Sequence, residues 1–294
     1  DEPVALTAKC QAEIRQVIYN TGGHIELQPW IYEPCFKDLS TFCSSITTPG
    51  QKQECLQDNI DKLQPNCKKS IQEFSKEAES DLHVDNYAYR ICKPMAKKFC
   101  AEEMAQDTEK PGGALIECMI KHKVHSDMTV ECAAVIEHYQ ILNLKDFKAS
   151  YNLAKTCRDD FTKHCKDTKT PVEALQCLSE IKMKSVIGAD QKETPGVEQL
   201  SPECAKELNF NLLQRSESVK LDPVLNKACG EDIEKFCPNV KPGKRRVTKC
   251  LESNRKELSE KCHTLLFKRE RAIYKDQRND MMLMRRCKGM IAKH

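Results

Sequence analysis

Long hydrophobic runs are missing from this sequence. No apolar stretch approaches the roughly 18 residues that a membrane-spanning helix needs, and the mean hydropathy is −0.62. Hydrophobic residues make up 39% of the chain, below the roughly 45–50% of ordinary globular domains. We therefore expect neither a single large hydrophobic core nor contact of this segment with a membrane.

Short catalytic, metal-binding and glycosylation motifs are missing too. The sequence has no Cys-x-x-Cys pair, which excludes the usual thiol-redox motif and zinc sites of short cysteine spacing. It also has no Asn-x-Ser/Thr sequon and no pattern that would assemble a catalytic triad. His122 and His125 have the spacing of metal ligands on a helix, but no further ligand recurs near them. We predict no catalytic activity, no metal and no cofactor.

Cysteine, by contrast, is abundant. Eighteen of the 294 residues are cysteine, an even set that is typical of an oxidising compartment. One cysteine stands near each end of the chain, Cys10 and Cys287. The other sixteen form four quartets: Cys35, Cys43, Cys55 and Cys67; Cys92, Cys100, Cys118 and Cys132; Cys157, Cys165, Cys177 and Cys204; Cys229, Cys237, Cys250 and Cys262.

The spacing of the cysteines is that of a tandem repeat. The first two members of each quartet are 8 residues apart, and the last member lies 25 residues before the next first member, five times in all when the end cysteines are included. The other two intervals vary, which indicates loops that tolerate insertions. Such a fixed period predicts repeated structural units rather than two large domains.

The residues around the cysteines predict helices. Apolar residues recur near them at helical spacing, and Asp222-Pro223 and Ser201-Pro202 have the form of helix starts. We predict an all-α, solenoid-like tandem array of small disulfide-stapled three-helix repeats. The expected boundaries are 1–27 for the end of a repeat, 28–83, 84–145, 146–217 with an insertion and 218–277 for whole repeats, and 278–294 for the start of another.

Two disulfide schemes fit the quartets. Nested pairing joins the first cysteine to the fourth and the second to the third, and it leaves Cys10 and Cys287 over. The other scheme keeps the second-to-third bridges but joins each fourth cysteine to the first of the next quartet, and it uses all eighteen. We favour the second scheme, because cysteines joined by a bridge need a fixed Cα separation. Its bridges are Cys10–Cys35, Cys67–Cys92, Cys132–Cys157, Cys204–Cys229, Cys262–Cys287, Cys43–Cys55, Cys100–Cys118, Cys165–Cys177 and Cys237–Cys250.

A specific motif runs through the quartets. The pattern is C-x7-C, a variable loop, C-L-x-x-N at Cys55–Asn59 and Cys250–Asn254, and then L-x-x-x-C. It resembles the cysteine-rich repeat of the Golgi apparatus protein 1 family, also called the cysteine-rich fibroblast growth factor receptor family. The resemblance covers nearly the whole chain. His164 in place of an aromatic residue, an insertion at Val186–Gln199 and His122 in place of the signature asparagine depart from it.

The resemblance implies a non-catalytic luminal segment of a Golgi type I membrane glycoprotein. It further implies binding of secreted proteins such as fibroblast growth factors, in the Golgi lumen, along the secretory pathway or at the cell surface. No single ligand-contacting residue can be carried over from the family.

Charge is unevenly distributed along the chain. Residues 241–294 hold 17 Lys and Arg against 6 Asp and Glu, whereas residues 1–240 hold 30 against 38. Blocks of like charge are typical of polyanion-binding patches or of solvated faces. The alternative function is therefore a heparan sulfate-binding or spacer segment, and nucleic acid is not expected in an oxidising lumen. The candidate polyanion-binding residues are Lys241, Lys244, Arg245, Arg246, Lys268, Arg269 and Arg271.

Overall fold

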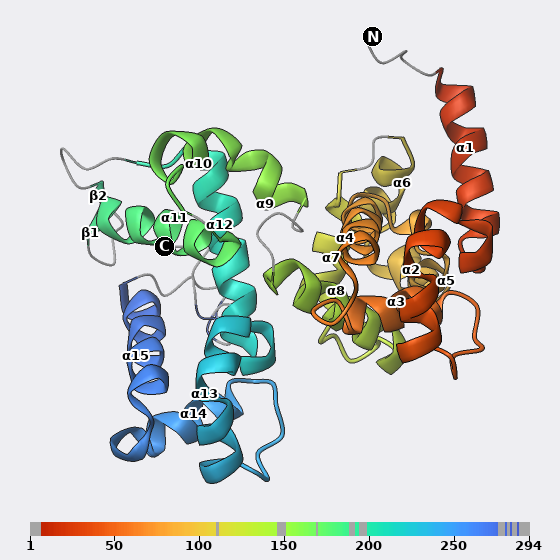
Figure 1. Ribbon diagram of the computed structural model, residues 1–294. Coiled ribbons are helices and arrows are strands. Elements are labelled where there is room, and N and C mark those ends of the chain that lie inside the picture. Colours follow the sequence, from red (N-terminus) through yellow and green to blue (C-terminus); the bar gives the residue numbers. More distant parts are fainter. Residues whose placement is uncertain are drawn as a thin grey trace. The chain divides into compact units, whose positions relative to one another are not determined.

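The computed structural model describes residues 7–109, 112–145, 151–168, 170–187, 192–193, 199–275, 280, 283 and 287. The chain divides into two compact units, residues 1–142 and 143–294. Helices make up both units, which confirms the predicted all-α repeat array (Figure 1). Among the described residues, no helix is both long enough and apolar enough to cross a membrane.

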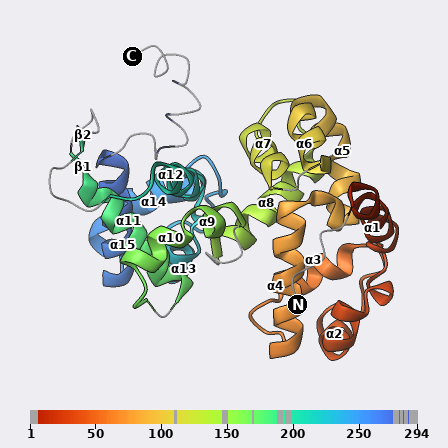
Figure 2. The ribbon, with the colours of Figure 1, turned by 90° about the horizontal axis from the view of Figure 1, so that it is seen from above.

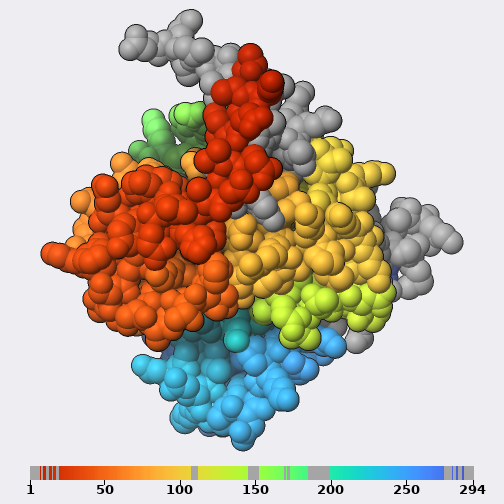
Figure 3. Space-filling view, turned by 90° about the vertical axis from the view of Figure 1, so that its right-hand side faces the viewer, coloured from red at the N-terminus to blue at the C-terminus, as the bar shows by residue number. Residues whose placement is uncertain are grey.

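The first unit is built from two repeats. Its elements are α1 Ala8–Thr21, η1 Ile25–Leu27, α2 Pro29–Phe42, α3 Gln51–Asp58, α4 Pro65–Ser80, η2 Leu82–Val84, α5 Asn86–Phe99, α6 Ala101–Glu109, α7 Ala114–His122 and α8 Val130–Lys145, which runs into the second unit. Helices α5, α6 and α7 gather into one cluster (Figure 2). Helix α1 lies on the surface of this unit, where Ile14 and Val17 are exposed (Figure 3).

The second unit is also built from two repeats, but its first repeat contains two short strands. Its elements are α9 Tyr151–Thr156, α10 Arg158–His164, α11 Pro171–Ser185, β1 Val186–Ile187, β2 Lys192–Glu193, α12 Pro202–Glu217, η3 Val219–Leu221, α13 Pro223–Phe236, α14 Arg246–Ser253, η4 Arg255–Glu257 and α15 Glu260–Lys275. The two short strands pair antiparallel inside the predicted insertion.

Each repeat has one cysteine pattern on three helical segments. The first segment carries cysteines one and two. The second helix carries cysteine three and has 8 or 9 residues in three repeats but 15 in α11. A 16-residue helix carries cysteine four near its start; these long helices are α4, α8, α12 and α15. The apolar residue after the third cysteine is fully buried in every repeat, at Leu56, Met119, Leu178 and Leu251. Burial of a large side chain at this position contributes about 1.5–3 kcal/mol to the stability of each repeat.

The disulfides follow the nested scheme. The four predicted second-to-third bridges are present, with Cα separations of 5.9–6.2 Å. The first cysteine, however, joins the fourth of its own quartet, in the bridges Cys35–Cys67, Cys92–Cys132, Cys157–Cys204 and Cys229–Cys262. The predicted bridges Cys10–Cys35, Cys67–Cys92, Cys132–Cys157, Cys204–Cys229 and Cys262–Cys287 were therefore wrong, and Cys10 and Cys287 are free thiols.

The constant 25-residue interval has another physical cause. After Cys67, helix α4 runs on to Ser80, a 3-10 turn follows, and Cys92 lies two turns inside α5. At 1.5 Å per residue, the 13 residues from Cys67 to Ser80 span about 20 Å, which is beyond the reach of a disulfide. In this described interval, the helical connection cannot gain or lose a residue without rotating the next helix, which accounts for its fixed length.

A buried aspartate caps the first long helix of two repeats. Asp85 accepts a hydrogen bond from the Ala88 amide (3.0 Å), and Asp222 accepts one from the Leu225 amide (3.2 Å). Each stands seven residues before the first cysteine of its repeat. A cap of this kind stabilises a helix by about 1 kcal/mol, because it satisfies an amide that lacks a helical partner.

The fourth-cysteine helix supplies the partner of this buried aspartate. Seven residues after the fourth cysteine stands Tyr139, whose hydroxyl donates to Asp85 (2.6 Å), and at the same position of the other unit Arg269 donates to Asp222 (2.5 and 3.1 Å). In the first repeat these two positions hold Gln28 and Phe74, and Gln28 makes no side-chain cap. In the three repeats whose cap position the structure describes, the cap and its partner are thus present together or absent together, and where present they join the first helix to the third.

The asparagine of the C-L-x-x-N signature ends the short helix. The side-chain amide of Asn59 donates to the Cys55 carbonyl (2.9 Å), and that of Asn254 donates to the Cys250 carbonyl (2.8 Å). Helices α3 and α14 end one residue before these asparagines. In the third repeat the position is Ile181, and α11 continues to Ser185. In the second repeat α7 ends at His122 even without the asparagine, so the signature residue caps the end of this helix in two repeats and is not the sole limit on its length.

Candidate functional site

The loop between Cys237 and Cys250 presents the first group of predicted polyanion-binding residues. Lys241, Lys244 and Arg246 are exposed. The Arg246 guanidinium donates to the carbonyls of Lys241 (2.9 Å) and Pro242 (2.8 Å), which closes the loop on itself. Three cations therefore stand on one short loop whose conformation is held by its own backbone.

Arg245 has a structural role instead. Its side chain is 15% exposed and pairs with Glu252 (3.2 Å) and Asp280 (2.6 Å). Its backbone is left-handed, with φ 56°, and its amide donates to the Glu217 carbonyl at the end of α12 (3.2 Å). Because its charge is neutralised by two carboxylates, Arg245 is a poor candidate for a polyanion contact.

The left-handed residue joins consecutive repeats. Gly50 and Gly113 stand five residues before the third cysteine, as Arg245 does, and have φ of 85° and 74°. Their amides donate to the carbonyls of Gly23 (2.9 Å) and Ser80 (3.1 Å), each 13 residues after a fourth-position cysteine. The starts of α3, α7 and α14 are thus each anchored to the chain at the end of the preceding long helix.

Helix α15 carries the second group of predicted residues. Lys268 and Arg271 are exposed, whereas Arg269 is half-buried and bonded to Asp222. Asp222 also forms an ion pair with Arg215 (3.4 Å). The Arg215 guanidinium in turn donates hydrogen bonds to the Leu144 carbonyl (2.5 Å) and to the Asn211 side chain (2.9 Å). The structure therefore leaves five of the seven predicted cations facing solvent and uses Arg245 and Arg269 internally.

The buried carboxylate of Asp222 lies between two guanidinium groups. Burial alone would raise the pKa of Asp222, but Arg269 and Arg215 outweigh burial and lower it. Burial, together with the charge of Arg269, lowers the pKa of Arg215 to about 10, although Asp222 opposes this change. By contrast, burial raises the pKa of Asp85, whose partner is the neutral hydroxyl of Tyr139. The fold thus lowers the pKa of the capping aspartate in the second unit and raises it in the first.

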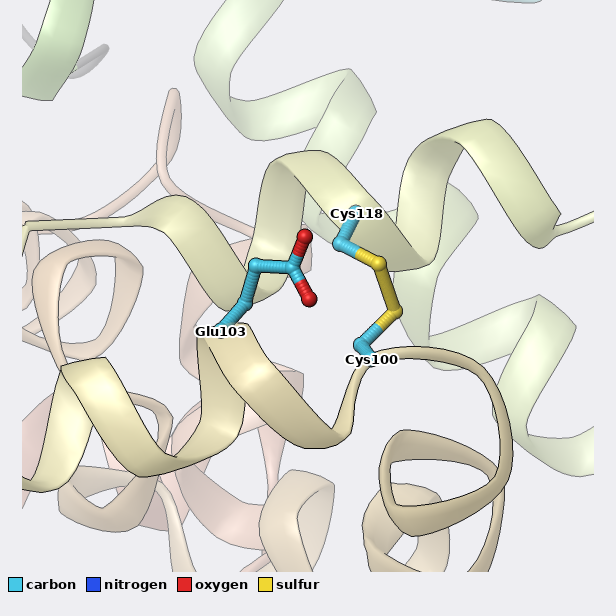
Figure 4. Close-up of side chains that lie close together, drawn as sticks. All are labelled: Cys100, Glu103 and Cys118. Atoms are coloured by element: carbon cyan, nitrogen blue, oxygen red, sulfur yellow. A yellow bond between two sulfur atoms is a disulfide. The ribbon is translucent and has the colours of Figure 1, made fainter.

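One group of potential metal ligands has a different chemistry. Cys100, Glu103 and Cys118 bring their ligand atoms within 4.8 Å of one another. Figure 4 shows that the two sulfur atoms are bonded to each other, with the Glu103 carboxylate beside them. Oxidised sulfurs do not provide the thiolate ligands that a metal requires. The group is therefore a disulfide next to a carboxylate.

His122 and His125 pack on an aromatic ring. The His122 ring stacks on Phe99 with centroids 5.2 Å apart and an interplanar angle of 11°, and the His125 ring lies 4.8 Å from the same phenylalanine. The His125 Nδ1 also accepts from the Asp127 amide (3.1 Å). These contacts join the end of α7 to the end of α5, which is a packing role.

The chain matches known proteins over nearly its whole length. The family model described as Cysteine rich repeat matches residues 8–64, 65–127, 130–185 and 202–259. Golgi apparatus protein 1 of Mus musculus and that of Homo sapiens are each 32% identical over 286 residues, which are 97% of this chain and 24% of each relative.

A more distant relative is matched over a similar share of its length. Golgi apparatus protein 1 homolog of Caenorhabditis elegans is 26% identical over 307 residues, 100% of this chain and 26% of that protein. The chain therefore spans about a quarter of the length of the curated relatives it matches. No solved structure matches it.

Proposed function

This chain belongs to the cysteine-rich repeat family, and on that premise we propose that it is a non-catalytic binding segment of a Golgi membrane glycoprotein. Its relatives named Golgi apparatus protein 1 support a Golgi location. In this proposal the segment lies on the luminal side and binds secreted proteins such as fibroblast growth factors. The family resemblance supports this class of ligand.

The charge of the first unit is the observation that carries the proposal. Residues 1–142 hold 22 Asp and Glu against 15 Lys and Arg, whereas residues 143–294 hold 22 against 32. A net charge of −7 on one compact unit attracts basic proteins over a distance and accelerates their encounter. Among the ligands that the family resemblance implies, basic growth factors have the charge that complements an acidic unit.

We expect the affinity for a basic fibroblast growth factor to fall as salt rises from about 50 to 500 mM, because the Debye length shrinks from roughly 14 to 4 Å over that range. Surface plasmon resonance with the immobilised chain measures it, and most of the change should lie in the association rate. An acidic secreted protein of similar size serves as the control. A response that stays flat with salt, or equal binding of the acidic control, would contradict electrostatic attraction by this unit.

A second candidate function rests on the basic loop. Lys241, Lys244 and Arg246 are exposed together, and such a group suits a sulfated glycan such as heparan sulfate. This function would belong to the second unit, so it is compatible with binding of a basic protein by the first.

For this second function we expect the triple variant Lys241→Glu, Lys244→Glu, Arg246→Glu to elute from heparin at clearly lower salt than the parent chain. Arg245 is left unchanged, because its replacement would break two ion pairs. The matched control is Lys37→Glu, Lys62→Glu, Lys69→Glu, which reverses three exposed charges in the first unit. Equal elution of the loop variant and the parent would show that the loop is only a solvated surface.

A further inference from the structure

The second unit contains a cavity that the sequence did not reveal. Its volume is about 280 Å³, and it is walled by α11, α12, α13 and α15, which can be followed in Figure 1. The apolar part of its lining comes from Leu175, Met183, Leu212, Val224, Leu265 and Ala272. It therefore lies where the third repeat packs against the fourth.

The cysteine register locates the same positions in the first unit. Ser179 in the cavity wall stands two residues after the third cysteine of its repeat, and it corresponds to Gln57 in the first unit. Glu180, one residue later, corresponds to Asp58. Eight residues after the fourth cysteine of the same repeat, Leu212 corresponds to Ser75. Six residues after the fourth cysteine of the following repeat, Lys268 corresponds to His138.

In the first unit these positions are joined by hydrogen bonds. The Gln57 side chain donates to the Ser75 hydroxyl (2.9 Å), and its carbonyl oxygen lies 2.9 Å from the His138 Nε2. The other ring nitrogen of His138 lies 3.3 Å from Asp58. We call Gln57, Asp58, Ser75 and His138 the polar plug, because the side chains bridge α3, α4 and α8.

The second unit cannot form the polar plug. Ser179 is too short to bridge the helices, and its hydroxyl donates back to the Leu175 carbonyl (2.6 Å). Leu212 has no hydrogen-bonding group at all. In addition, α11 runs past Ile181 to Ser185, so that Met183 and Lys184 extend the cavity wall. The cavity thus results from specific substitutions in a fold that closes the same place elsewhere.

The rim of the cavity is cationic. Lys268 and Arg271 are exposed at its edge, Lys184 and Arg269 also line it, and Glu180 is the acidic residue in the lining. Cations around an apolar floor attract anionic groups that carry apolar neighbours. A sulfated glycan would match the rim but would leave the apolar floor without a partner.

We propose that this cavity is the docking site for an acidic peptide segment of a partner protein, one that presents a large apolar side chain between carboxylates. The apolar side chain enters the cavity as an anchor, and the carboxylates lie on Lys268 and Arg271. At about 280 Å³ the cavity lies at the lower end of the roughly 300–1,000 Å³ that ligand pockets span, which is ample room for one large apolar side chain. Anchors of this kind supply most of the binding energy of an interface. The proposal is independent of growth-factor binding by the acidic unit.

The test uses the full chain and a fluorescein-labelled peptide in which one leucine stands between two pairs of glutamates. Fluorescence anisotropy should show salt-sensitive binding, and Arg271→Glu should weaken it at least about fivefold, the scale of a charge contact worth about 1 kcal/mol. Lys69→Glu, the same change at an exposed site in the first unit, should leave it unchanged. Replacing the leucine of the peptide by alanine should weaken binding by about tenfold or more.

A second variant fills the cavity and at the same time replaces one rim cation, so Lys268→His alone is its control and should weaken peptide binding without abolishing it. Ser179→Gln, Leu212→Ser, Lys268→His transfers the polar plug into the second unit, and binding of the peptide should be lost while the helical circular dichroism is retained. Undiminished peptide binding by Arg271→Glu would overturn the proposal. So would equal binding of the alanine peptide, or binding of the aromatic sulfonate anilinonaphthalene sulfonate at this cavity with no binding of the peptide.

Discussion

Replacing Cys157 and Cys204 together by alanine is expected to lower the free energy of unfolding of the second unit by about 4 kcal/mol, because the lost bridge closes a loop of 47 residues. Replacing Cys165 and Cys177, which close a loop of 12 residues, should cost less, about 3 kcal/mol on the same chain-entropy argument. Urea unfolding followed by circular dichroism measures both. Pairing between quartets would instead place Cys157 and Cys204 in two separate bridges, so the same double replacement would then break two loops and cost well over 4 kcal/mol, on the order of 7 kcal/mol.

The control for this experiment replaces Cys10 and Cys287. Both are free thiols in the structure, so their removal should leave the free energy of unfolding unchanged and should lower the thiol count of the denatured, non-reduced chain from two to zero. Peptide mapping without reduction should recover Cys35 with Cys67. Loss of stability in the Cys10, Cys287 variant, or a peptide joining Cys67 to Cys92, would restore bridges between quartets.

Replacing Asp222 by alanine is expected to cost about 3–5 kcal/mol of unfolding free energy in the second unit, the usual cost of removing one partner from a buried charge cluster. The loss combines a helix cap with the neutralisation of Arg215 and Arg269, which would then share a buried site without their common anion. Hydrogen exchange measured by mass spectrometry should localise the faster exchange to α12, α13 and α15.

Asp127→Ala is the matched control for this substitution. Asp127 pairs with Lys98 at 2.7 Å on the surface, where water screens the pair. The unfolding midpoint should therefore not move measurably. If Asp222→Ala were equally silent, the buried cluster would have no stabilising role.

The two capping aspartates also predict opposite responses to acid. The folded state lowers the pKa of Asp222, so its stabilisation is present above about pH 4, the unfolded value, and is lost as the pH falls through the lower folded value. The folded state raises the pKa of Asp85, so its contribution is greatest below that pH and declines as the pH rises through the folded value. Asp222→Asn should thus remove part of the acid sensitivity of the second unit, and Asp85→Asn should not.

Much of this fold could be predicted from the sequence, because cysteines and apolar residues report local periodicity. The third-cysteine leucines, such as Leu56 and Leu251, are buried as their helical spacing indicates. The bridges between quartets were misassigned for a physical reason. A constant separation along the chain can come from a cross-link or from a rigid connection, and the 16-residue helices provide the second.

The candidate sites were harder to predict, because the same residue type serves different roles. Arg245 and Lys244 are neighbours in a basic run, yet Arg245 is held by two carboxylates that lie 7 and 35 residues away. One signal was available in the sequence, since Asp85 with Tyr139 and Asp222 with Arg269 stand at matching distances from their cysteines. The cavity gave no such signal, because it depends on how side chains of four helices fill space.

The long helices give the array a staggered construction. Three of the four matched family repeats, 65–127, 130–185 and 202–259, begin with the helix whose cysteine closes the preceding covalent loop. The sequence repeat therefore begins one helix before the start of its own disulfide-closed loop. Removing residues 65–127 would bring Cys132 to the place of Cys67, so Cys35 would again face a cysteine at the start of a 16-residue helix. An array built in this way can change its number of repeats during evolution and still leave every internal loop closed.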